Sequence, residues 1–283
     1  ACAEDAIIDN PTRERGQWAG DVATVGMEIA AAGFADLRLF RRGLKQCAQC
    51  ARDDGLVAGL CPGGRAYLTT YAAQWVSACL RYRQLTGDDA LLRELLPSAE
   101  RNIGAFEKWW TDSGVRDEAG WGFVDWGYVR NAGPVDIGVN LHIAAALRDM
   151  VTWCDALGES AKRERYARLH ATLGRTLASW FAGKDWEEIG LHRAVLGLRG
   201  GFIPEHRAQA AVEFIKRHIR HAFPLQADAP RLSDPEAANP HLFTPYFAHY
   251  ALPVLMERGE ANFVLDVYRR AWGWALEDGR TTW

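Results

Sequence analysis

Apolar side chains recur at spacings of three and four residues along nearly the whole chain, whereas runs that alternate apolar and polar residues are scarce. The first spacing places apolar side chains on one face of a helix, and alternation is the pattern of a half-buried strand. The pattern therefore predicts an all-α protein. We expect ten helices, near residues 16–32, 35–53, 66–86, 88–112, 137–158, 161–182, 187–199, 204–221, 245–258 and 260–278.

Glycine and proline fall between these predicted helices and mark the turns. Short turns alternate with three long connections at 55–65, 113–136 and 222–244. In a barrel of helical hairpins such long loops gather at one end, where a site is built. No linker rich in Ser, Gly or Pro divides the chain, so we expect a single domain over residues 1–283. An irregular solenoid is the alternative, but it usually shows a repeat of roughly 30 to 45 residues, which is not visible here.

Composition limits the kind of partner. The chain has 48% hydrophobic and 24% charged residues, which is typical of a folded globular protein. A net charge of −3 gives no reason to expect a nucleic acid or an anionic membrane as partner. No run of about twenty apolar residues could span a bilayer. A neutral, polar ligand suits this balance. With no signal peptide and no disulfide framework in the chain, a cytoplasmic location is favoured over secretion.

The cysteines and histidines do not indicate a metal site. Six cysteines are spread thinly, and Cys47-x-x-Cys50 has no second Cys pair or nearby His at ligand spacing. Two helical thiols are therefore favoured over zinc. The eight histidines form no HExxH pair, and the chain has no Gly-rich phosphate loop. We expect neither a metal nor another cofactor.

Tryptophan is several times more frequent than usual, with twelve residues in 283. Its flat apolar face stacks on sugar rings, and its single donor needs a partner when buried. Most of the tryptophans on helical stretches are expected in the core. Trp18, Trp75 and Trp126 lie beside turns or motif residues and are the better candidates for ligand contacts.

The segment from Asp9 to Asp21 concentrates charge around Glu14 and Trp18. Pro11 favours a loop that leads into a helix starting near residue 15. Trp18 follows Glu14 by one helical turn and Asp21 lies a further turn on, so all three can share one helix face. An ordinary helix start with acidic residues near the positive end of the helix dipole is the alternative.

A carboxyl group among apolar or like-charged neighbours has a raised pKa and can act as a general acid near neutral pH. Glu14, between two acidic flanks and next to Trp18, is the best candidate for such a raised pKa. Arg13 and Arg15 would oppose the shift, and the sequence leaves that balance open.

The spacing of Asp9, Glu14 and Asp21, with Trp18 and Gly20 in place, resembles the acidic motif at the start of the catalytic (α/α)6 barrel of bacterial α-L-rhamnosidases. Gln17 departs from this pattern, because the family usually has Gly before the Trp. Further matches follow in the same order at Thr86-Gly87-Asp88, Phe123-Val124-Asp125-Trp126-Gly127, Thr244-Pro245-Tyr246-Phe247, Trp272-Gly273-Trp274, Asp278-Gly279 and Thr281-Thr282-Trp283.

The resemblance implies an (α/α)6 barrel of six helical hairpins, of which this chain holds about ten of twelve helices and lacks one at each end. It implies an inverting enzyme that removes terminal α-L-rhamnose from glycosides, with Glu14 as general acid. The general base of the family is a Glu just after the Thr-Thr-Trp turn, which would lie beyond Trp283; Glu277 and Asp278 have a structural interpretation. The substrate-binding residues implied are Asp9 and Asp21 on rhamnose hydroxyls, Arg13 and Trp18 in the pocket wall, Trp75 and Trp126 against the sugar's apolar face, and Asp125 as a hydroxyl acceptor.

Two alternatives remain open. Another (α/α)6 activity, an unsaturated uronyl hydrolase or a polysaccharide lyase, handles acidic sugars and would need a basic pocket. A non-catalytic helical sugar-binding domain would keep the tryptophan walls but would not need Glu14.

Overall fold

The computed structural model describes residues 3, 5–119, 121–131, 134–222, 243–273 and 276 of the chain. Within these residues the chain forms ten α-helices, which confirms the all-α prediction. They are α1 (Met27–Gly33), α2 (Arg38–Gln49), α3 (Thr69–Thr86), α4 (Asp89–Lys108), α5 (Ile137–Leu157), α6 (Ser160–Ala182), α7 (Trp186–Gly200), α8 (Glu205–Ala222), α9 (Pro245–Glu257) and α10 (Ala261–Ala271). A π-helix, η1 (Ala19–Gly26), runs directly into α1.

Glycine residues end several helices, and capping side chains begin others, at the turns that the sequence predicted. Gly87, Gly158 and Gly201 follow α3, α5 and α7 with φ of 73°, 75° and 72°, a left-handed conformation that glycine adopts without steric cost. Four side chains accept a hydrogen bond from the backbone N–H three residues later, those of Asp88, Asp136, Asp185 and Thr244. The Thr-Gly-Asp turn therefore closes one helix and starts the next, as predicted.

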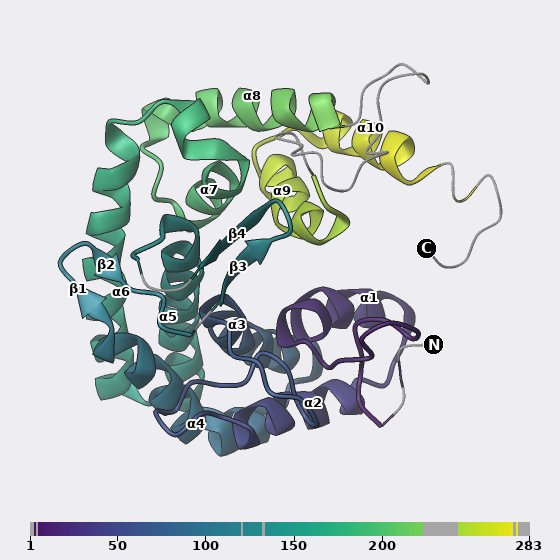
Figure 1. Ribbon diagram of the computed structural model, residues 1–283, viewed down its shortest axis with the longest axis vertical. Helices are drawn as coiled ribbons and strands as arrows, with labels where there is room; N and C mark the ends of the chain where they lie inside the picture. The colour runs from purple at the N-terminus through teal and green to yellow at the C-terminus, as the bar shows by residue number, and fades with distance from the viewer. Residues whose placement is uncertain are drawn as a thin grey trace. The chain divides into compact units, whose positions relative to one another are not determined.

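The chain divides into two compact units. Unit 1 comprises Ala1–Val124 and Tyr128–Ser179. In it, α3 packs against α5, η1 and α4, and α4 also packs against α5 (Figure 1). The buried Asn102 amide of α4 donates to the Ala72 carbonyl at 2.8 Å and accepts from the Val57 N–H at 2.9 Å. This side chain joins α3, α4 and the loop between α2 and α3.

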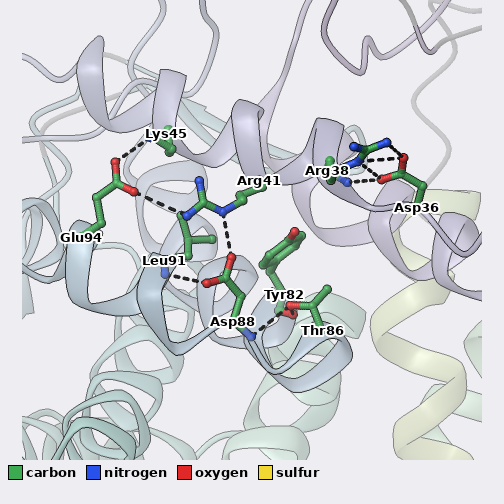
Figure 2. A network of polar contacts seen from close by, with 9 residues as sticks. All are labelled: Asp36, Arg38, Arg41, Lys45, Tyr82, Thr86, Asp88, Leu91 and Glu94. Carbon is green, nitrogen blue, oxygen red and sulfur yellow. Dashed lines mark hydrogen bonds and ion pairs between the residues drawn. The ribbon is translucent and has the colours of Figure 1, made fainter.

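Ion pairs link α2 to the start of α4 (Figure 2). Arg41 of α2 donates to Asp88 Oδ2 at 2.7 Å and lies 3.6 Å from Glu94, which also pairs with Lys45 at 2.6 Å. Asp88 is thus both the cap of α4 and an anchor for α2.

Unit 2 comprises Asp125–Gly127 and Trp180–Trp283. Here α7 packs against α8 and α9, and α10 packs against α9. Gly197 of α7 lets the Phe181 ring at the end of α6 approach α7, because a Cβ at that position would lie 2.5 Å from this ring. The prediction of a single domain is not tested by this division and stays a prediction.

Four short strands in the 110–131 region were not predicted. β1 (Trp110–Thr111) pairs with β2 (Gly114–Val115), and β3 (Trp121–Asp125) pairs with β4 (Tyr128–Asn131). As a result, α4 ends at Lys108 and not near residue 112. Near the end of the chain, α10 ends at Ala271. Residues 274, 275 and 277–283 lie outside the described part.

In the part of the chain that the structure describes, no helix combines the length and the apolar character needed to cross a bilayer.

Candidate active site

The loop that precedes η1 is closed by its own polar groups. The Asp9 N–H donates to the Gly16 carbonyl at 2.8 Å, and Asp9 Oδ1 accepts from the Gly16 N–H at 2.8 Å. The second carboxylate oxygen of Asp9 accepts from the Asn10 amide at 2.6 Å. Asn10 Oδ1 in turn accepts from the backbone N–H groups of Thr12 and Arg13. Asp9 therefore braces the loop that carries Glu14.

The helix after this loop starts later than predicted. Residues 15–17 are not helical, and Arg15 has a φ of 52°. Trp18 is extended and forms an antiparallel bridge with Leu60, while the Ala19 N–H donates to the Gly59 carbonyl at 2.8 Å. Pairing with a distant segment keeps this stretch extended, so η1 begins only at Ala19.

The prediction that Glu14, Trp18 and Asp21 share one helix face is therefore wrong, but Glu14 and Trp18 do meet. Trp18 Nε1 donates to Glu14 Oε2 at 2.8 Å, and the Arg13 guanidinium lies 3.3 Å from Glu14 Oε1. The Glu14 side chain is 41% exposed. Its carboxyl group is thus oriented by two donors and still reachable from solvent.

Asp21 lies in the first turn of η1, and its pKa is raised above the usual value. Burial raises the pKa of Asp21, the Tyr71 hydroxyl opposes the rise by donating to Oδ2 at 2.7 Å, and the charges of Asp9 and Glu14 add to it. The three carboxyl groups are therefore close enough to interact, as their spacing in the sequence suggested.

Tyr71 is a residue of this site that sequence reasoning missed. It lies in the first turn of α3, is almost fully buried, and its ring meets the Trp18 ring edge-on with centroids 6.1 Å apart. A Cβ at Gly20 would lie 2.3 Å from the Tyr71 ring, so only glycine allows this approach. The Gly20-Asp21 pair was the available signal, whereas a buried aromatic on a helix gives none.

Gln17, which departs from the family pattern, has a structural role. Its buried amide donates to the Cys61 carbonyl at 3.1 Å and to Gln46 Oε1 at 3.2 Å. Gly43 of α2 makes room for it, because a Cβ there would lie 2.6 Å from Gln17 Oε1. The glutamine thus fastens the segment before Trp18 to α2 and to the loop that follows α2.

Trp75 does not line a ligand site. The side chain is fully buried, its Nε1 donates to the Leu44 carbonyl at 2.9 Å, and its ring packs near Trp153 of α5 at 6.4 Å between centroids. A ring enclosed between helices has no face to offer a sugar. The prediction of Trp75 as a substrate wall is therefore wrong.

Asp125 ends β3 and Trp126 follows it in the turn of the β3–β4 hairpin; both belong to unit 2, but their surroundings differ. Asp125 is fully buried, with Oδ2 at 2.8 Å from His192 Nε2 and Oδ1 accepting from the Thr244 hydroxyl at 2.5 Å. The Gly127 N–H also donates to Oδ2. Asp125 thus accepts a hydrogen bond from a hydroxyl group of the chain itself, and its full burial leaves no surface for a ligand. Trp126 is 61% exposed.

The family model of the bacterial alpha-L-rhamnosidase 6 hairpin glycosidase domain matches residues 1–227. The chain belongs to this family. The match covers the acidic segment, the Thr-Gly-Asp turn and the hairpin with Asp125 and Trp126.

Solved structures similar to this glycosidase domain are themselves rhamnosidases. The GH78 family rhamnosidase of Bacillus sp. GL1 has a TM-score of 0.80 at 21% identity, over 99% of this chain and 29% of that one. A rhamnosidase from Klebsiella oxytoca with rhamnose bound has a TM-score of 0.76 at 19% identity, over 98% of this chain and 52% of that one. The α-L-rhamnosidase of Streptomyces avermitilis complexed with L-rhamnose has a TM-score of 0.71 at 20% identity, over 98% and 26%.

The six-hairpin family and these similarities confirm the (α/α)6 fold class. The chain spans about a quarter to a half of the length of these rhamnosidases. None of the curated proteins matches it.

Among the described residues, no three His, Cys, Asp or Glu side chains gather in a way that could hold a metal ion. The motif residues Trp274, Asp278, Gly279 and Thr281 to Trp283, together with Glu277, lie outside the described part of the chain.

Proposed function

We propose that this chain belongs to the catalytic domain of a glycoside hydrolase that removes terminal α-L-rhamnose from rhamnosides by an inverting acid/base mechanism. The observation that carries the proposal is the Glu14 carboxyl group, which is exposed, oriented by Trp18 and Arg13, and close to two further carboxyl groups. Membership of the six-hairpin glycosidase family supports hydrolysis of a glycoside.

Glu14 is proposed as the general acid that protonates the leaving oxygen of the aglycone. Both oxygens of Asp9 are engaged in closing the loop, and Asp21 is largely buried against Tyr71. Of the three, Glu14 is the carboxyl group that a leaving oxygen can approach. The Trp18 indole donates a hydrogen bond to Glu14 Oε2, and this bond restricts rotation of the Glu14 carboxyl group.

Asp9 and Asp21 are proposed to accept hydrogen bonds from rhamnose hydroxyls. A carboxylate oxygen has two acceptor sites, so the bonds that each already makes within the chain leave capacity for a sugar hydroxyl. Arg13, which is highly exposed beside Glu14, would lie at the edge of the pocket. Trp126 is proposed to contact a sugar ring, because its own ring is exposed and indole faces stack on sugar rings.

Inversion needs a second carboxylate about 6.5 to 9.5 Å from the acid, with room for a water molecule between them. We assign this general base to a glutamate that follows Trp283 in the full-length protein. Support comes from the resemblance of Thr281-Thr282-Trp283 to the turn that precedes the base in α-L-rhamnosidases.

A rhamnose-containing glycoside is the proposed substrate. The similar enzymes from Klebsiella oxytoca and Streptomyces avermitilis were solved with rhamnose. The segment around Glu14 also suits a neutral sugar, because three carboxyl groups would repel the carboxylate of a uronic acid.

Hydrolysis of an aryl α-L-rhamnoside with a poor leaving group by the full-length protein tests the proposal, with Glu14→Gln as the variant. We expect the variant to lose about 10²- to 10⁴-fold in kcat, the usual contribution of general acid catalysis. Glu164→Gln is the matched control, because Glu164 is an exposed glutamate of α6. NMR of the product anomer first released should show β-rhamnose, as inversion requires.

Three results would contradict the proposal. Equal activity of Glu14→Gln and Glu164→Gln would remove the assignment of the acid, and α-rhamnose as first product would remove inversion. Rhamnose binding without turnover by the folded full-length protein would favour a sugar-binding domain.

A further inference from the structure

Two buried cysteines meet between α2 and the loop that joins it to α3. Cys47 lies in the last turn of α2 and Cys61 lies in the loop, and their Sγ atoms are 3.6 Å apart. Both side chains are enclosed, and both are free thiols. The sequence predicted a helical thiol at Cys47 and gave no sign that Cys61 contacts it.

The Gln17 side chain holds the two segments that carry these thiols. Its amide donates to Gln46 Oε1, next to Cys47, at 3.2 Å and to the Cys61 carbonyl at 3.1 Å. The same Nε2 atom lies 3.8 Å from Cys61 Sγ, and the Cys61 N–H donates to the Gln17 carbonyl at 3.4 Å. The folded chain therefore fixes the backbone on both sides of the contact between the sulfurs.

The sulfurs are close enough to be joined. An S–S bond is about 2.05 Å long, so the two atoms need to approach each other by roughly 1.5 Å, which rotation of two short side chains can provide. The hydrogen bond with Cys47 also lowers the pKa of Cys61, although burial opposes this, and Gln17 lowers it further. Cys61 is therefore suited to be the attacking thiolate in a disulfide exchange.

We propose that Cys47 and Cys61 form a disulfide when the chain folds in the presence of a small-molecule disulfide such as oxidised glutathione. In the open chain, where the oxidant reaches both thiols, the Cys47 thiolate attacks one sulfur of oxidised glutathione. The S–S bond of glutathione breaks, and one glutathione thiolate leaves. As the loop packs against α2, the Cys61 thiolate attacks the Cys47 sulfur of the mixed disulfide and expels the second glutathione.

The reaction is balanced within these groups. Two protein thiols are oxidised, one oxidised glutathione is reduced to two thiols, and the two protons of the protein thiols pass to the departing glutathione thiolates. Because both sulfurs are enclosed in the folded chain, the finished disulfide should be protected from reduction.

The disulfide would strengthen the loop next to the candidate active site. It would close the segment between Cys47 and Cys61, and such a closure stabilises a protein by constraining its unfolded chain. Leu60, the residue before Cys61, forms the bridge with Trp18. The disulfide would therefore anchor to α2 the backbone that pairs with Trp18.

Cys50 provides an internal competitor for this pairing. It is three residues from Cys47, whereas Cys61 is 14 residues away. In an unfolded chain the shorter loop costs less entropy to close, so chain length alone favours Cys50 as the partner. A link between Cys47 and Cys61 would thus report the contact in the folded chain.

Peptide mapping of the full-length protein tests the inference and does not depend on its activity. The reduced protein is unfolded in urea and refolded by dilution into a mixture of reduced and oxidised glutathione, while a second sample stays in urea with the same mixture. Free thiols are alkylated, and linked peptides are identified by mass spectrometry. The ratio of linked to unlinked Cys47–Cys61 peptides should be at least about tenfold higher after refolding, because folding raises the effective concentration of one thiol at the other.

A sample that has never been unfolded, kept for days in the same mixture, serves as the second measurement. Local opening of the loop should lead slowly to the same linkage. The oxidised protein should also have a higher Tm than the reduced protein. These two results keep the test valid if refolding from urea is incomplete.

Two variants complete the test. Cys61→Ser should lose the linkage, whereas Cys50→Ala, which removes the half-buried competitor at the end of α2, should form it as the wild type does. Circular dichroism shows that each variant is folded. The proposal would be overturned if Cys47 and Cys61 stay reduced in both samples of folded protein, if Cys47 pairs with Cys50 instead, or if the linked ratio is equal in urea and after refolding.

Discussion

The Tyr71 hydroxyl donates a hydrogen bond to Asp21 Oδ2 at 2.7 Å and so joins the first turn of α3 to the first turn of η1. Burial raises the pKa of Asp21, and this hydrogen bond is the largest opposing effect. The same tyrosine ring meets Trp18, which holds Glu14. Tyr71 therefore supports two of the three acidic residues at once.

Removal of the hydroxyl in Tyr71→Phe should raise the pKa of Asp21 further. A folded-state pKa above the unfolded value of 3.8 means that the stability contributed by protonated Asp21 is present below that value and is lost as pH rises through the folded pKa. The variant should therefore lose about 1.5 to 3 kcal/mol near neutral pH, as for a hydrogen bond to a charged group, and less in acid. Urea unfolding across pH measures the loss, and carboxyl ¹³C NMR measures the pKa. An unchanged pKa of Asp21 would show that Tyr71 does not control it.

Trp18→Phe should weaken catalysis while keeping the aromatic contact with Tyr71. The change removes the Nε1 donor to Glu14, and one hydrogen bond of about 1.4 kcal/mol corresponds to about tenfold in kcat. Steady-state kinetics on an aryl rhamnoside measure it, with thermal unfolding to show that the variant is folded. A kcat equal to that of the wild type would mean that Trp18 does not orient the acid.

Asp125 and Trp126 should give opposite results although they are adjacent. Asp125→Ala removes the acceptor shared by the buried His192 and the half-buried Thr244, which should cost about 3 kcal/mol or more in the free energy of unfolding. Trp126→Ala changes an exposed ring and should alter that free energy by about 0.5 kcal/mol or less, while raising KM for a rhamnoside. Chemical unfolding and kinetics on both variants test the pair. A stable Asp125→Ala protein would contradict the structural role of this carboxylate.

Asp88 and Asp36 offer a second matched pair, on the network of Figure 2. Asp88→Ala removes both the α4 cap on Leu91 and the ion pair with Arg41, and should cost about 1 to 2 kcal/mol. Burial works against ionisation, but the hydrogen bonds from Arg41 and the Leu91 backbone leave the pKa of Asp88 lowered. Its contribution should therefore be present above the usual pKa of 3.8 and be lost as pH falls through the lower folded value.

Asp36→Ala is the control for that measurement. Arg38 lowers the pKa of Asp36 to about 2, but both side chains are exposed and water screens the pair. We expect no measurable change in Tm for Asp36→Ala. A larger loss from Asp36→Ala than from Asp88→Ala would reverse our assignment of which pair stabilises the protein.

Local signals in the sequence were sufficient for the helices. Each of the ten had its own apolar period, and turns such as Gly87-Asp88 punctuated them, so their order and approximate bounds could be predicted. The start of η1 could not be predicted, because a contact between Trp18 and the distant Leu60 decides it. The β3–β4 hairpin was missed because its strands are short and lie in a long connection.

The sequence predicted which charged residues form the candidate site, but it did not predict the surroundings of each side chain. The spacing of Asp9, Glu14 and Asp21 identified the segment. The sequence did not show that Asp21 and Trp75 are buried, because their burial depends on packing between distant elements, including α3 and α2. Trp75 and Trp126 both stand near motifs in the sequence, yet one is enclosed and the other exposed. The cytoplasmic location stays a prediction.

The measurement that most directly tests the central claim compares two aryl α-L-rhamnosides, one with a good and one with a poor leaving group, on the full-length protein and Glu14→Gln. If Glu14 is the general acid, the variant should keep most of its activity on the substrate whose leaving group needs no proton. On the other substrate it should lose about 10²-fold or more. Equal losses on both substrates would contradict the assignment of Glu14 as the proton donor.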